Sequence, residues 1–238
     1  MNVVAHPLAA VLADAAEGCF PPADGRTDVL PPDGDGTVAV VAFSGHAFVL
    51  ADVDSDEVAR RATDGAGGGF GGVLDPTLLI WLAGDERTIG SIDVVLTARA
   101  RGAPNADDLL PVLDVVDHPR VRRAFAHRRH VEVRGDDRGV VVLGRGLVGR
   151  RELSLELFDG TAMSTGAGRD LITRGLAAVP AGEWCWAQVA AGNTRSLRAF
   201  SAAGFRPVCA EVLLPPARAS GESAPPKRWP SLPRTEGR

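Results

Sequence analysis

Hydrophobic residues recur along this chain with two periods, one typical of strands and one typical of helices. Two apolar stretches, 37–43 and 46–53, meet at Ser44-Gly45 and predict a hairpin. Val58 and Ala62 lie four residues apart after an acidic start, as in a helix. Over the whole chain, the patterns predict helices at 6–17, 54–63, 76–83, 105–113, 119–128, 166–178 and 193–203. They predict strands at 37–43, 46–53, 89–100, 130–134, 139–145, 150–158, 184–189 and 205–214.

The order of these elements predicts the fold class. From residue 89 onward the order is β-α-α-β-β-β-α-β-α-β, and two short turns join the three successive strands into an antiparallel meander. We therefore expect an α+β fold: a mixed, largely antiparallel twisted sheet flanked by helices, with an N-terminal αββα extension. The expected units are an extension or lobe over 1–88, a main domain over 89–214, and a disordered Pro- and Arg-rich tail over 215–238.

Composition limits the class of protein. Of the 238 residues, 45% are hydrophobic and 24% are charged, as in soluble globular proteins. The net charge is −4, and the tail after Leu214 carries five basic and two acidic residues, which leaves about −7 for the rest. An acidic body argues against a nucleic-acid partner and is compatible with a cationic substrate.

Cysteine usage and hydropathy indicate the compartment. Cys19, Cys185 and Cys209 lie far apart without a CxxC spacing, which favours a reducing environment over a disulfide scaffold or a zinc site. No apolar run approaches the about 18 residues of a membrane span, and the N-terminus lacks a basic start. We expect a cytoplasmic protein.

The stretch 160–205 holds the strongest candidate chemistry. A strand, a short loop with Gly166 and Gly168, and a helix follow one another. The free amides and the positive dipole end of a helix N-terminus bind anions, and glycine allows a phosphate to approach closely. Arg169 stands within reach to add a charge-assisted contact. The sequence therefore predicts an anion site around residues 163–169.

This loop and the element order resemble those of a known family. The Gly166-Ala167-Gly168 loop and a second helix, headed by Asn193 and closed by Gly204-Phe205, resemble the GNAT superfamily of acyl-CoA-dependent N-acetyltransferases. The resemblance covers roughly residues 90–214. It implies transfer of an acetyl group from acetyl-CoA, without a metal, to a primary amine of a small molecule or a peptide. From the acidic body and the lack of a membrane span we expect no nucleic-acid or membrane partner, and a homodimer stays open.

The resemblance also implies which residues bind the cofactor. The pyrophosphate would lie on the loop amides, although the family's Gln or Arg at the first loop position is Met163 here. The pantetheine arm would lie between the strands 150–158 and 184–189 and bond to main chain there. The implied cofactor-binding residues are Leu157, Phe158, Met163, Ser164, Thr165, Gly166, Ala167, Gly168, Arg169, Asn193, Ser196 and Phe200.

Two glutamates are candidate catalytic residues. Glu152 falls where the histone-acetylating branch of the family keeps its general base, which an ammonium acceptor needs because it has no lone pair. Glu156 is the second candidate, since a bulge in the strand changes which side chain faces the cleft. The alternative is that Glu152 is a solvated strand residue paired with Arg150 or Arg151.

The family's tyrosine general acid is absent. Its position is Phe200, and the chain contains no tyrosine. Water, Ser196 or Ser201 would then protonate the thiolate. The absence also supports an alternative function, a module that binds or senses acyl-CoA without turnover.

Two further expectations concern the rest of the chain. The Arg-rich run 120–129 predicts a solvated helix face, with a minor alternative of contact to phosphates. The family sheet usually ends in two C-terminal strands, whereas only 205–214 precedes the tail. We therefore expect a strand from 38–50 to fill the missing edge or to form a lobe over the acceptor site.

Overall fold

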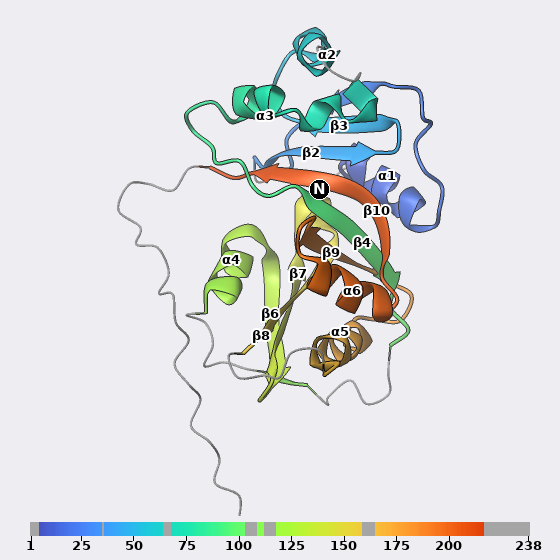
Figure 1. Cartoon of the computed structure of the whole chain (residues 1–238), viewed down its shortest axis with the longest axis vertical. Coiled ribbons are helices and arrows are strands. Elements are labelled where there is room, and N and C mark those ends of the chain that lie inside the picture. The colour runs from blue at the N-terminus through green and yellow to red at the C-terminus, as the bar shows by residue number, and fades with distance from the viewer. Residues whose placement is uncertain are drawn as a thin grey trace, which may run out of the picture.

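The computed structural model describes residues 5–34, 36–63, 68–102, 109–111, 118–158 and 165–216 (Figure 1). Within these ranges, ten strands form one sheet in the order β1-β3-β2-β10-β4-β9-β8-β7-β6-β5. The strands are β1 Thr27–Leu30, β2 Val38–Phe43, β3 His46–Leu50, β4 Asp93–Arg99, β5 Leu110–Pro111, β6 Arg129–Asp136, β7 Gly139–Arg145, β8 Arg151–Leu157, β9 Trp184–Ala190 and β10 Arg206–Leu214. The helices are α1 Pro7–Ala16, α2 Ser55–Thr63, α3 Pro76–Ala83, α4 Pro119–His127, α5 Ala167–Ala177 and α6 Thr194–Ala202.

The sheet is mixed and largely antiparallel, in agreement with the α+β class. Only β1 with β3 and β8 with β9 pair in parallel among the described strands. The predicted meander is present, because β7 pairs antiparallel with both β6 and β8. The hairpin of β2 and β3 continues the sheet beyond β10, with Val38 opposite Leu214 and Ala42 opposite Ala210. The strands of the first 50 residues thus belong to the same sheet as the rest.

β4 occupies a place that its position in the chain does not indicate. It pairs antiparallel with β9 along its whole length and with β10 on the other side. A strand from the first half of the chain therefore lies between the last two strands. This insertion places β10 inside the sheet, where it is covered on both edges.

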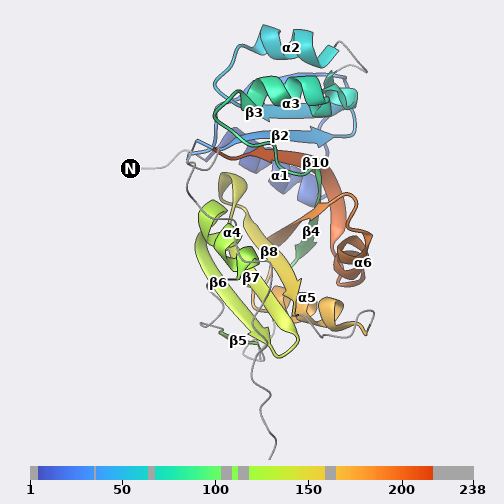
Figure 2. The ribbon, with the colours of Figure 1, turned by 60° about the vertical axis from the view of Figure 1, so that its left-hand side comes forward.

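Helices cover both faces of the sheet. α5 and α6 pack over β4, β7, β8 and β9, while α2 and α3 pack on the same face farther along, over β2, β3 and β10. α1 and α4 cover the opposite face, α1 over β2, β3, β4 and β9, and α4 over β6 and β7. Figure 2 shows α4 and α5 on opposite sides of the strands β6 to β8. Alternate residues of each strand therefore belong to different cores.

Two predicted elements differ in the structure. The sequence predicts no strand over 21–36, but Thr27–Leu30 form β1, which pairs with β3. A helix is predicted over 105–113, but in its described part Leu110–Pro111 pair with β6 as β5. Both strands are short and obtain their hydrogen bonds from residues distant in sequence, so no local pattern reveals them. Residues 217–238 of the tail lie outside the described residues. In the part of the chain that is described, none of the helices has the length and apolar character that a membrane crossing requires.

Candidate functional site

The parallel strands β8 and β9 meet at one end and diverge at the other. They pair only at Arg151 opposite Cys185 and Glu152 opposite Trp186. Beyond these residues β8 continues to Leu157 and β9 to Ala190, each held along its full length by its outer neighbour, β7 or β4. The facing edges of the diverging halves do not pair with each other within the described strands. Their backbone N–H and C=O groups are therefore available to an extended ligand.

The helices α5 and α6 begin at the open end of this divergence. α5 follows β8 and α6 follows β9, and the two helices lie side by side (Figure 1). Gly168 lies close to β8, because a side chain there would meet Leu155 at 3.3 Å, and it faces Ala199 of α6 at an ordinary contact distance of 3.9 Å. Two helix N-termini thus point toward one region at the end of the sheet.

The two helix starts differ in how their free amides are satisfied. At α6 the Asn193 side chain accepts a hydrogen bond from the Ser196 amide at 3.1 Å, as expected of an N-cap. At α5 the cap residue is Gly166, which has φ of 87° and offers no side-chain acceptor. Within the described residues, no side chain caps the first amides of α5, so they can bind an external anion. Thr165 and Arg169 flank this start and are exposed.

A charged cluster holds the start of α5 against the β6–β7 hairpin. Arg138 donates to Asp136 and to Asp170, both at 2.6 Å, and Arg174 donates to Asp136 at 2.9 Å. Burial would raise the pKa of Asp136, but hydrogen bonds and charge from Arg138 outweigh it and lower that pKa. The first turns of α5 are thereby anchored at two carboxylates.

A buried ion network lies where β8 and β9 meet, on the face opposite α5. Glu152 is 2% exposed and accepts from Arg150 Nε at 2.8 Å and from Arg128 Nε at 2.7 Å. Arg150 also donates to both carboxylate oxygens of Glu211, at 2.7 and 2.9 Å, and Gln188 donates to the same carboxylate. The network joins Arg128, which lies between α4 and β6, to β8, β9 and β10, and its two cations balance its two anions.

The surrounding backbone is shaped around this network. A side chain on Gly146 would collide with the Glu152 carboxylate, so only glycine leaves room for it. The guanidinium of Arg150 lies over the ring of Trp186, 5.7 Å from the ring centre. Burial would raise the pKa of Glu152, but the charges of Arg150 and Arg128 outweigh it and lower that pKa. Glu152 is therefore held as a carboxylate with both oxygens occupied.

These contacts bear on the predicted catalytic residues. The expected pairing of Glu152 with Arg150 is present, but the pair is buried and not solvated. Because its pKa is lowered and both of its oxygens are bonded, Glu152 has little of the proton affinity that a general base needs. Glu156 lies on the same face of β8, half-buried and nearer the open end.

The structure brings together most of the predicted cofactor-binding residues that it describes. Leu157 and Phe158 end β8, Thr165 to Arg169 begin α5, and Asn193 begins α6, all at one end of the sheet. Phe200 is 3% exposed and stacks edge-on against Phe205 with ring centres 5.0 Å apart, so its ring belongs to the core. Met163 and Ser164 lie outside the described residues.

Apart from Arg150, the residues of the network around Glu152 could not be predicted from the sequence. Arg128 belongs to the Arg-rich run predicted as a solvated face, yet its side chain is 10% exposed and bonds to Glu152 and Ser154. Glu211 and Gln188 follow the alternation of ordinary strands and carry no local signal. Only the spacing of Arg150 and Glu152, two residues apart on one strand, indicates a shared face.

Comparisons with known proteins give a distant likeness. No protein-family model matches the chain, and no curated protein matches it at a significant level. One similar solved structure is a GNAT-family acetyltransferase from Colwellia psychrerythraea, with 9% identity and a TM-score of 0.35, covering 56% of this chain and 58% of that one. Another is a putative GNAT-family acetyltransferase from Novosphingobium aromaticivorans, with 16% identity and a TM-score of 0.36, covering 56% of this chain and 69% of that one. The chain thus spans little more than half of the first structure, and the likeness concerns the coarse α+β fold alone.

Proposed function

We propose that this protein transfers an acetyl group from acetyl-CoA to a primary amine by direct attack in a ternary complex. The observation that carries the proposal is the divergence of the parallel strands β8 and β9, with the N-termini of α5 and α6 at its open end. Unpaired strand edges suit an extended arm with amide groups, and an uncapped helix start suits a pyrophosphate. Coenzyme A combines both groups with an acyl thioester.

The residues at the open end fit such a ligand. Gly166 adopts φ of 87°, and a side chain at this position would meet nothing within 4 Å, so the start of α5 is accessible. In the proposal, the amides from Ser164 to Arg169 hold the pyrophosphate, and the main chain of Leu157 binds the arm. The amide of Phe158, also predicted to bind the arm, instead donates to the Arg138 carbonyl at 2.9 Å. Acetyl-CoA would supply an acyl group attached to a good leaving thiolate.

The proposal gives the two glutamates different roles. Glu152 positions Arg150 and Arg128 at the narrow end, since its carboxylate is bonded to both. Glu156, half-buried and nearer the open end, accepts the proton of the amine, directly or through a water. Without a tyrosine in the chain, the thiolate takes its proton from water or from Ser196.

Cofactor binding tests the first part of the proposal. Isothermal titration with coenzyme A should give binding that Arg169→Glu weakens about fivefold or more, because Arg169 lies in the first turn of α5. Arg198→Glu, an equally exposed arginine within α6, is the matched control and should change affinity little. Pantetheine, which lacks the phosphates, should bind both variants alike. Absence of coenzyme A binding in the wild-type protein refutes the proposal.

Turnover separates the enzyme from its alternative. Release of free thiol from acetyl-CoA in the presence of a broad panel of amines supports catalysis, and Glu156→Gln should then lower kcat about a hundredfold. Cofactor binding without thiol release from any amine would instead indicate a module that senses acyl-CoA. Glu156→Gln with unchanged kcat would remove Glu156 from the mechanism.

A further inference from the structure

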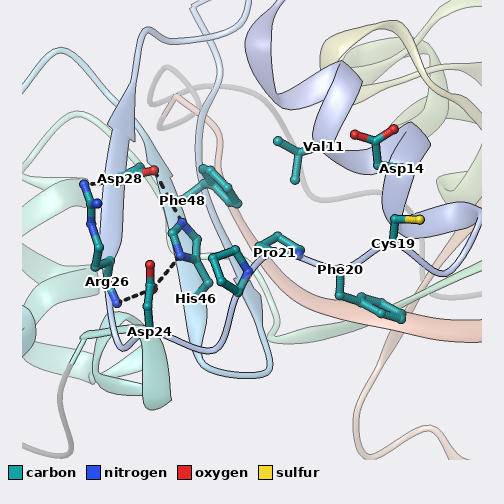
Figure 3. A pocket seen from close by; sticks show the side chains of 11 residues that line it. Val11, Asp14, Cys19, Phe20, Pro21, Asp24, Arg26, Asp28, His46 and Phe48 are labelled. Atoms are coloured by element: carbon teal, nitrogen blue, oxygen red, sulfur yellow. Dashed lines mark hydrogen bonds and ion pairs between the residues drawn. The ribbon is translucent and has the colours of Figure 1, made fainter.

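A cavity lies far from the divergence of β8 and β9. It has a volume of about 520 Å³, within the range of small-molecule sites, and lies between α1, the connector 19–26, β1 and β3 (Figure 3). In the sheet, β2, β10 and β4 separate β3 from β9. At a strand spacing of about 4.8 Å this amounts to about 19 Å. The cavity is therefore distinct from the proposed acyl-transfer site.

Backbone hydrogen bonds form the wall of this cavity before any ligand binds. The connector is fixed to the β2–β3 hairpin by bonds from Gly25 N to Gly45 O at 2.8 Å and from Ala47 N to Arg26 O at 3.0 Å. Gly45 has φ of 85°, and a side chain there would contact Ala23 at 2.7 Å, so the two segments pack closely. A preformed wall lowers the entropic cost of binding.

One side of the cavity carries a histidine between two carboxylates. His46 is 4% exposed, with Nδ1 2.8 Å from Asp24 Oδ1 and Nε2 3.4 Å from Asp28 Oδ2 (Figure 3). Because each ring nitrogen faces a carboxylate, His46 has none left to activate the thiol of Cys19, which also lines the cavity. The arrangement is therefore suited to binding and not to nucleophilic catalysis.

The polar lining of the cavity is negative. Asp24 and Asp28 contact His46, and Asp28 also pairs with Arg26, while Asp14 lies on α1 at the other side of the cavity (Figure 3). The lining therefore has an excess of negative charge even when His46 is protonated. A hydrogen bond from the Arg26 amide, followed by one from His46, lowers the pKa of Asp24 and keeps it ionised. Among the described residues, the Asp14 carboxylate and Asp24 Oδ2 have no hydrogen-bond partner. Both can accept bonds from a cation.

The remaining lining is apolar. Phe20 and Phe48 contribute aromatic rings, and Val11, Pro21 and Pro22 complete the wall. Phe20 is 54% exposed, so its ring is accessible to a ligand. Aromatic rings next to carboxylates attract organic cations through both the ring quadrupole and the opposite charge.

From this geometry we infer that the cavity binds a small organic ammonium ion with an apolar body. The ammonium group lies between Asp14 on one side of the cavity and Asp24 and Asp28 on the other, and the apolar body contacts Phe20 and Phe48. The inference does not depend on the proposed acetyl transfer, because no residue of the cavity belongs to that site. It gives the N-terminal part of the chain a binding role of its own.

Three probes of similar size test this inference on the full chain. Phenethylammonium, phenethyl alcohol and phenylacetate share an aromatic body and carry positive, zero and negative charge. Titration calorimetry should show phenethylammonium binding at least about fivefold more tightly than the alcohol, with phenylacetate weaker still. Raising the salt from about 0.05 M to about 0.5 M should weaken phenethylammonium binding by screening the carboxylates.

Variants and NMR locate the bound probe. Asp14→Asn and Asp28→Asn should each weaken phenethylammonium binding about threefold or more, whereas Asp85→Asn, an exposed control outside the cavity, should not. Asp14 is exposed and its carboxylate has no hydrogen-bond partner among the described residues, so its variant should fold normally by circular dichroism. Amide shifts on titration should cluster at Thr27–Leu30 and around Phe48. Equal binding of the three probes, no effect of both variants, or shifts confined to β8 and β9 would each overturn the inference, whatever the result with coenzyme A.

Discussion

Replacing Arg150 with methionine should destabilise the fold by about 3–5 kcal/mol, the cost of leaving a buried charge unpaired. The Arg150 side chain is 4% exposed and donates three hydrogen bonds, two to Glu211 and one to Glu152. Methionine fills most of the same volume, so the loss of stability comes from the unpaired carboxylates and not from a new cavity. Glu211 loses its cation, whereas Glu152 keeps its bond to Arg128.

Urea unfolding followed by tryptophan fluorescence measures this loss. Trp186 lies 5.7 Å from the Arg150 guanidinium and reports on the same region. The m-value should stay constant while the midpoint falls, and the thermal midpoint should drop by about 6–20 °C for a chain of this size. Arg151→Met is the matched control. Arg151 is the next residue, its side chain is 17% exposed, and its ion pair with Glu183 should contribute at most about 1 kcal/mol.

A second substitution separates charge burial from packing. Adding Glu211→Leu to Arg150→Met removes the unpaired carboxylate and should recover part of the lost stability, so the two changes should not be additive. A cost of Arg150→Met below about 1 kcal/mol, or one equal to that of Arg151→Met, would refute the energetic role of the network.

The same network predicts a dependence on acid. Burial alone would raise the pKa of Glu152, but Arg150 and Arg128 lower it below its ordinary 4.5. A carboxylate whose pKa is lowered in the folded state stabilises the fold at pH values above its pKa in the unfolded chain. This stabilisation is lost as the pH falls through its pKa in the folded protein. Wild-type stability should therefore decrease below pH 4.5, and Arg150→Met should show a smaller decrease.

Three further predictions concern other parts of the molecule. Gly146→Ala should cost about 1–3 kcal/mol in urea unfolding, because its methyl group would collide with Glu152, whereas Gly192→Ala, with nothing within 4 Å, should be nearly neutral. Burial raises the pKa of Cys185 to about 12 and also raises that of Cys209, so only Cys19 should react with a thiol reagent in the folded protein, and three thiols should react in urea. Asp136→Asn should lower the free energy of unfolding at neutral pH by about 0.5–1 kcal/mol. It should also reduce the loss of stability below pH 3.8, because the pKa of Asp136 is lowered and its carboxylate stabilises the fold only at higher pH.

Local sequence determined most of the helices and strands. Helix starts depend on contacts within a few residues, as at His6, Asp75 and Asn193, whose side chains accept bonds from amides two or three positions on. The hairpin of β2 and β3 and the meander of β6 to β8 likewise follow from turns between adjacent apolar stretches. The glycine start of α5, which belongs to the candidate site, could likewise be predicted because it depends on neighbouring residues.

Tertiary structure alone decided where distant segments meet. β1 and β5 gain their hydrogen bonds only from β3 and β6, and β4 lies between β9 and β10 through pairing with strands about 90 to 120 residues later in the chain. The role of Glu152 depends in the same way on segments that are far apart. Strand alternation sets which face carries a charge, but burial depends on which helix and which neighbouring strands cover that face. Arg128, in the link between α4 and β6, and Glu211 of β10 reach Arg150 and Glu152 only after the sheet has assembled, so the sequence defined the position of Glu152 and the fold defined its partners.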